Sequence, residues 1–457
     1  MGTARSRLPG VLVHIGFLAL GLLANHFRLE RLYLDSSYYL FHTINDGWFR
    51  VEHQRFVLAF SELPVLLATW LTIGVKPLIV IWSLTHVLWP WLAAWWLMGR
   101  WKRVDLAAAM LLLQVVGLRE LYFSPMMEIF YGAIFALLLV GLADRDPGLS
   151  KRLSLGAWCA FALLLVTSHP EHLITYLVIV ALFLPWRADL KRSLALLTLP
   201  IAVLVAMKLA FLSDYEAGRF AAVTSPFGQG GDFGGNVMRA LHAGFELMPE
   251  SLMLVVICGI IGWRSQLFVN AAAPLLGTFL LLVAVSLARS IHGVDRDLES
   301  AFFPITVIAL VACCSIRSSG SRIPAGVLLF TAVSLFTLRV TTVTRASTPF
   351  TSRVEALDAI CAQALSAGKP KVIVPFERTR PLYHWEWSAP MESLLLSAAD
   401  HTACVSILTT EDLVVIPSLS SLNEHQVVLR RWDVKRATQL REPWNALDAT
   451  TYAELGE

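Results

Sequence analysis

Apolar stretches of the length that membrane-spanning helices require recur along the first three quarters of this sequence. A helix needs about 20 mostly apolar residues to cross the hydrocarbon core of a bilayer. The chain offers eleven apolar cores from which such helices can extend: Leu8–Ala24, Pro77–Met98, Val104–Leu118, Met126–Ala143, Ser154–Ser168, Leu173–Trp186, Ser193–Ser213, Leu252–Trp263, Leu267–Leu287, Ala301–Cys314 and Ile323–Leu338. The pattern predicts an all-α polytopic membrane protein with about 11 transmembrane helices.

The composition excludes several other classes. Hydrophobic residues make up 56% of the 457 residues and charged residues only 16%, against about 25% charged residues in an average soluble domain. A soluble enzyme or a disordered chain of this length needs more polar surface than that. The formal net charge of +3 is too small to indicate nucleic acid or another polyanion as the partner.

Basic residues gather on alternate links between the apolar cores. By the positive-inside rule these links are cytoplasmic. The sequence therefore predicts an integral plasma (inner) membrane protein whose first apolar stretch is a retained signal-anchor, with a cytoplasmic N-terminus and an extracytoplasmic C-terminal region. The residues behind this prediction are Arg5, Arg7, Arg100, Lys102, Arg103, Arg145, Lys151, Arg152, Arg187, Lys191, Arg192, Arg264, Arg317 and Arg322.

One apolar stretch does not fit this count. Phe56–Val75 contains Glu62 and Pro64, and Lys76 follows it directly. A crossing here would place Arg100–Arg103 outside and invert every later link. We therefore predict an interfacial or re-entrant helix that lies along the headgroups in the first outer loop.

The composition changes after residue 340. Ser352–Ala367 has helical spacing, and short apolar runs at Lys371–Pro375, Cys404–Leu408, Leu413–Ile416 and Gln426–Leu429 are typical of strands. We predict a membrane domain over residues 1–340 and a small extracytoplasmic α/β domain over residues 341–457.

The predicted outer loops hold nearly all the carboxylates and histidines that could do chemistry. Loops of this kind are either simply solvated or parts of one site at the outer membrane interface. The first loop runs from Asp35 to Glu62, the third is the turn His169-Pro170-Glu171-His172, and the fifth contains Arg296. A Gly-rich stretch in the fourth loop, residues 228–235, lacks phosphate-loop spacing and suits a mobile loop over a site.

Each candidate residue also has a plainer interpretation. Asp35, about ten residues after the first span, could act as a general base or hold a metal, or it could cap a helix. His169, Glu171 and His172 could bind phosphate or a metal or do acid–base work, or they could form a polar hairpin turn.

Two further residues have the same ambiguity. Glu128 could bind substrate hydroxyls or complement the dipole of its own helix. Arg296 could bind a phosphate through its fork of donors, or extend its head to the interface without any ligand.

This arrangement resembles the GT-C superfamily of integral-membrane glycosyltransferases, which includes the protein O-mannosyltransferases and the lipid A aminoarabinose transferases. Asp35 stands where these enzymes have an acidic residue in the first outer loop, and the string Arg296–Pro304 is similar to their entry into a late span. Asp35-Ser36-Ser37 lacks the acidic pair that is usual there, and Asp297 replaces the Tyr that usually follows the Arg.

The resemblance implies sugar transfer from a polyprenyl-phosphate-linked donor to a lipid or glycan acceptor at the extracytoplasmic face. It implies Asp35 as the catalytic base and Arg296, with Arg55 or His172, as ligands of the donor phosphate. His169, Glu171 and Glu128 would line the sugar or acceptor pocket. No cofactor is certain, and a divalent cation remains an option. The alternatives are a lipid-linked glycan polymerase or ligase, a lipid flippase or transporter, and a non-catalytic membrane scaffold.

Overall fold

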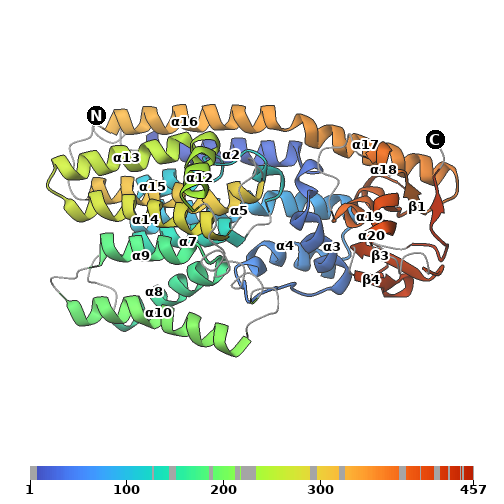
Figure 1. The fold of residues 1–457 in the computed structure, drawn as a ribbon, viewed down its shortest axis with the longest axis horizontal. Helices are drawn as coiled ribbons and strands as arrows, with labels where there is room; N and C mark the ends of the chain where they lie inside the picture. Colours follow the sequence, from blue (N-terminus) through green and yellow to red (C-terminus); the bar gives the residue numbers. More distant parts are fainter. Residues whose placement is uncertain are drawn as a thin grey trace.

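The computed structural model describes residues 8–125, 128–143, 151–184, 189–211, 217, 233–288, 296–318, 325–379, 387–401, 403–415, 422–430, 433–442, 444 and 447–455. The chain is mostly helical. Long helices pack side by side over most of the elongated molecule, and the C-terminal helices and short strands gather at one end (Figure 1). The amphipathic helix α3 (Asp35–Asp46) and the short helix α4 (Leu58–Trp70) lie between these two parts.

Six of the described helices are long and apolar enough to cross a membrane, and a pair bent by 103°, α12 and α13, would make a seventh span. The six are α2 (Leu8–His26), α5 (Val75–Trp101), α10 (Leu190–Phe211), α14 (Phe268–Ala288), α15 (Arg296–Ser318) and the helix that starts with α16 (Ala325–Ala346). The bent pair is α12 (Phe233–Leu247) and α13 (Pro249–Arg264).

Every one of the eleven predicted apolar cores contains a helix, but several of these helices are short. They are α6 (Val104–Leu112), α7 (Glu128–Ala143), α8 (Lys151–Ser168) and α9 (His172–Phe183). Helix α6 is shorter than its apolar core because the chain then turns through Gly117, whose φ is +73°, a conformation that glycine adopts readily. The count of eleven crossings stays a prediction.

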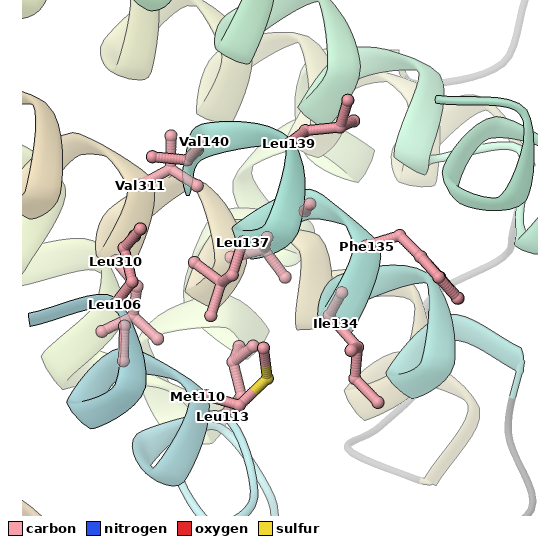
Figure 2. Packing of buried hydrophobic residues seen from close by; sticks show 14 of the residues in the cluster. Leu106, Met110, Leu113, Ile134, Phe135, Leu137, Leu139, Val140, Leu310 and Val311 are labelled. Carbon is pink, nitrogen blue, oxygen red and sulfur yellow. The ribbon is translucent and has the colours of Figure 1, made fainter. Parts of the chain in front are cut away.

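Helix α15 is the central helix of the membrane part, with 94% of its most apolar 18-residue stretch buried. It packs against α6, α7, α9, α13 and α14. Leu106, Met110 and Leu113 meet side chains of α7 and the pair Leu310 and Val311 of α15 in one apolar cluster (Figure 2). Helices α10 and α16 are mostly exposed, as expected of helices whose other faces would contact lipid.

Within the segment Phe56–Val75 the structure contains helix α4, which has 13 residues. Helix α4 ends at Trp70 and α5 begins at Val75 after a short turn, where Thr72 has a φ of +55°. Whether α4 lies along headgroups stays a prediction.

After α16 the chain forms α17 (Thr348–Ser366), α18 (Phe376–Thr379), α19 (Ala389–Asp400), α20 (Thr410–Val415) and five short strands. Strand β1 (Lys371–Val374) lies between β2 (Ser406–Thr409) and β5 (Ala453–Glu454) in a parallel sheet, with Lys371 opposite Ser406. Strands β3 (Gln426–Arg430) and β4 (Asp433–Arg436) form an antiparallel pair.

The strand predicted at Leu413–Ile416 is wrong, because helix α20 occupies its described residues. The carboxylate of Asp412 accepts hydrogen bonds from the backbone and the hydroxyl of Thr409, at 3.0 and 2.9 Å. Such local side-chain bonds favour a helical turn directly after a strand.

The C-terminal elements share a hydrophobic core with α3, α4 and the start of α5. Phe41 and Ile44 of α3 are fully buried in this core with Leu394 of α19 and Val372 of β1. The boundary predicted at residue 340 falls inside α16. The first loop and the last hundred residues therefore fold against each other, and the polar face of α3 is placed at their junction.

Candidate functional site

Asp35 is the first residue of α3, at the junction of the membrane helices and the C-terminal elements (Figure 1). The residue before it, Leu34, is the N-cap and has a φ of +56°. The interpretation of Asp35 as the helix cap is therefore not supported. The Leu34 N–H donates to Glu392 Oε1 of α19 at 3.2 Å, so the C-terminal part fixes where α3 begins. The side chain of Asp35 remains partly exposed.

Several charged groups lie near Tyr39, which is one turn after Asp35 in α3. Burial raises the pKa of Tyr39 well above its usual value, the nearby carboxylates of Glu128, Glu52 and Asp35 raise it further, and Arg55 lowers it. Three of the predicted site residues, Asp35, Arg55 and Glu128, therefore lie around one buried phenol. They come from α3, from the loop before α4 and from the start of α7.

Arg55 and Glu128 form an ion pair, with side chains that are 18% and 8% exposed. Glu128 is the first described residue of α7, so its charge also suits the helix N-terminus. The pairing means that the guanidinium of Arg55 is already partly neutralised. A phosphate would have to compete with Glu128 or share Arg55 with it.

A second group of polar side chains surrounds Tyr38 of the same helix. Tyr38 donates a hydrogen bond to Glu52, and Arg50 Nε lies 3.1 Å from the Tyr38 hydroxyl and 3.2 Å from Glu52 Oε1. Burial alone would raise the pKa of Glu52, but the Tyr38 hydrogen bond and the Arg50 charge outweigh it, so that pKa lies below its usual value. Glu52 is thus held as a carboxylate.

The C-terminal strands complete this group from the other side. The guanidinium of Arg430, at the end of β3, lies 4.5 Å from the centre of the Tyr38 ring. Lys435 of β4 reaches Asp46 at 3.3 Å. We call Asp35, Tyr38, Tyr39, Arg50, Glu52, Arg55, Glu128 and Arg430 the α3 cluster. No local motif marks Arg430, because its partner Tyr38 is almost 400 residues away in the chain.

The predicted His-Pro-Glu-His turn lies beside the start of α7. His172 is fully buried, and its Nε2 lies 2.8 Å from the carbonyl oxygen of Ile129, the residue after Glu128. Its ring therefore joins α9 to α7, which favours a structural role. His169 and Glu171 contact each other, and both are partly exposed. Through His172, this turn is held beside Ile129, the residue that follows Glu128.

Arg296 begins α15, but its side chain lies outside the described part of the structure. Three residues later, Glu299 accepts hydrogen bonds from the backbone N–H groups of Arg119, Glu120 and Leu121 at 2.9 to 3.2 Å. Of the Gly-rich stretch, residues 228–232 also lie outside the described residues, and helix α12 begins at Phe233.

Within the described ranges, no group of three or more His, Cys, Asp or Glu side chains is arranged to hold a metal ion. The site is instead a set of paired carboxylates and guanidinium groups around two tyrosines. Fold and site together define a mostly helical chain with several helices that could cross a membrane and a polar cluster at one end of them. No protein-family model, curated protein or solved structure matches the chain.

Proposed function

We propose that this chain is a membrane glycosyltransferase of the GT-C type. It would move a sugar from a polyprenyl-phosphate-linked donor to a lipid or glycan acceptor at the extracytoplasmic face. In this proposal the protein has about eleven crossings, a cytoplasmic N-terminus and an extracytoplasmic C-terminal α/β domain. The observation that carries it is the position of Asp35, which lies partly exposed at the start of α3 with Arg55 and Glu128 close to the neighbouring Tyr39.

The chemistry assigns each group a task. The acceptor hydroxyl oxygen attacks the anomeric carbon of the donor sugar, and the hydroxyl proton passes to the Asp35 carboxylate. The bond between the anomeric carbon and the phosphate oxygen breaks, and the lipid phosphate leaves with the electron pair. Arg55 and Arg296 are the cations proposed to stabilise that leaving charge. The pairing of Arg55 with Glu128 would hold its guanidinium in place.

The direct test replaces Asp35 by Asn. The purified full chain is reconstituted in liposomes and supplied with polyprenyl-phosphate mannose or aminoarabinose, and sugar transfer to added lipid acceptors is measured. We expect transfer by D35N to fall by 10² or more, as for the loss of a general base. The matched control is Asp400→Asn, which removes only a carboxylate partnered by Lys76 on the surface. Equal transfer by D35N and wild type, with equal melting temperatures, rejects Asp35 as the base.

A lipid transporter is the second candidate, and one observation favours it. Helices α12 and α13 are bent by 103° at a break next to Met248, and broken helices are typical of transporter binding sites. The two candidates differ in their product. A transporter moves a fluorescent polyprenyl-phosphate lipid between leaflets without forming a new glycosidic bond, and D35N leaves that movement unchanged.

A further inference from the structure

A small cavity lies between α2, α5, α7 and the turn that precedes α7. Its volume is about 30 Å³. One water occupies roughly 10–15 Å³ on this scale, so the cavity has room for two or three waters or for one compact polyatomic group. None of the predicted site residues is among those that line it. The described residues around it are Leu20, Arg31, His86, Val87, Pro90, Gln114, Leu118, Leu121, Tyr122, Pro125, Phe130, Tyr131 and Ile134.

Arg31 places a buried positive charge at this cavity. Its side chain is 2% exposed. The guanidinium donates to the Tyr122 carbonyl at 2.8 Å and the Ser83 carbonyl at 3.5 Å, and it lies 4.4 Å from the centre of the Tyr122 ring. These partners are neutral, and among the described residues no carboxylate forms an ion pair with Arg31. A buried charge that lacks a counter-ion is costly.

Three polar atoms at the cavity lack a hydrogen-bond partner within the described structure. They are Arg31 Nε, His86 Nε2 and the Tyr122 hydroxyl, from residues that are at most 6% exposed. The Tyr122 hydroxyl also lies close to the Arg31 guanidinium, so both can face the same ligand. The other ring nitrogen of His86, Nδ1, lies 2.8 Å from the Tyr131 hydroxyl. When Tyr131 donates to Nδ1, the neutral ring carries its hydrogen on Nε2. All three atoms can then donate.

Three donors and one unbalanced positive charge around a compact space match a single kind of ligand. Water could satisfy the donors but would leave the charge unbalanced, and an apolar guest would leave both unsatisfied. An oxyanion accepts several hydrogen bonds and neutralises the guanidinium, for which charge-assisted bonds are the strongest type. The rest of the lining is mainly apolar, which restricts the ligand to a small group.

We propose that this cavity is a binding site for one small oxyanion group, a phosphate, held by Arg31, His86 and Tyr122. The phosphate is either a free ion or the headgroup of a lipid whose tails stay outside the cavity. The site is independent of sugar transfer, because it shares none of the residues assigned to that reaction.

The test uses Tyr122→Phe in the purified full chain. This change removes the unpartnered hydroxyl but keeps the ring beside Arg31 and the backbone carbonyl to which Arg31 donates. Without ligand, the variant should melt at or above the wild-type temperature, because an unpartnered buried hydroxyl costs stability. With ligand, it should bind about tenfold more weakly, the usual effect of one hydrogen bond to a charged group. The control, Tyr452→Phe, removes a buried hydroxyl of the C-terminal sheet.

Two ligand series distinguish the sources of the phosphate. One titrates inorganic phosphate into the detergent-solubilised chain at constant ionic strength, and the other compares nanodiscs of phosphatidylcholine with nanodiscs that contain phosphatidic acid. The site is supported if the ligand raises the melting temperature of the wild type and of Y452F but raises that of Y122F less. A rise in the first series identifies the ligand as a free ion, and a rise in the second identifies it as a lipid headgroup. The proposal is overturned if neither ligand raises the wild-type melting temperature, or if Y122F responds as the wild type does.

Discussion

Glu62 shows how one carboxylate can link the folding of α4 to pH. Its side chain is fully buried, Oε2 accepts the Arg50 backbone N–H at 2.6 Å, and Oε1 lacks a partner among the described residues. Burial raises the pKa of Glu62 to about 8, from 4.5. Between these two values the folded chain holds a proton that the unfolded chain releases, so stability falls as pH rises through this window.

The prediction concerns Glu62→Gln. Between pH 5.5 and 8, the wild type should lose stability with a contribution from Glu62 of up to about 1.4 kcal/mol per pH unit, and E62Q should lack that contribution. Denaturant unfolding of the purified chain at several pH values measures the slope. Glu411→Gln, at an exposed position of α20, is the control and should keep the wild-type slope. Equal slopes for all three proteins contradict the prediction.

A buried ion pair positions the start of α3. Arg353 of α17 contacts Glu392 of α19, and both side chains are 2% exposed. Glu392 also accepts the Leu34 N–H. Glu392→Gln leaves the Arg353 charge buried without its full counter-charge, and we expect a loss of about 3–5 kcal/mol in stability. Lys76→Ala breaks the exposed pair with Asp400 and should cost at most about 1 kcal/mol. Denaturant unfolding followed by fluorescence compares the two, and similar losses would contradict the prediction.

At the scale of the element, Gly132 determines how closely α7 approaches α8 and α9. A Cβ atom at Gly132 would meet Ser168 Oγ and would lie 2.7 Å from the His172 ring, which the Ile129 carbonyl holds in place. Gly132→Ala should therefore cost about 1–3 kcal/mol through overpacking. Gly156→Ala, on α8 in open space, should be neutral or add up to about 1 kcal/mol. The melting temperatures of both variants, each compared with that of the wild type, test this prediction. Equal shifts would refute the packing argument.

Helices were the most predictable elements, because a run of apolar side chains is a local property of the sequence. Their ends were less predictable. Helix α6 ends at Leu112, before the turn that contains Gly117, and the apolar run at Leu413–Ile416 contributes to a helix because Asp412 bonds to Thr409. Within the site, Asp35 could be selected from its place after the first apolar stretch. Arg430 could not, because only the tertiary fold brings it to Tyr38.

At the scale of the whole molecule, orientation is a testable prediction. Ser366, at the end of α17, and Lys102, after α5, are both exposed. If the C-terminal part is extracytoplasmic, Ser366→Cys in intact cells should react with a membrane-impermeant maleimide, whereas Lys102→Cys should react only after permeabilisation. The reverse labelling pattern would place the α3 cluster on the cytoplasmic side and remove the basis for an outer-face reaction.

The core that α3 shares with the C-terminal elements also sets an order of assembly during synthesis. Phe41 and Ile44 emerge from the ribosome early, whereas their partners in α19 and β2 are about 350 residues further along. At a synthesis rate of roughly 5–20 residues per second, the apolar face of α3 stays uncovered for tens of seconds, until the residues that pack on it have been made. The polar cluster on that helix is therefore completed last, when the final hundred residues have folded onto the first loop.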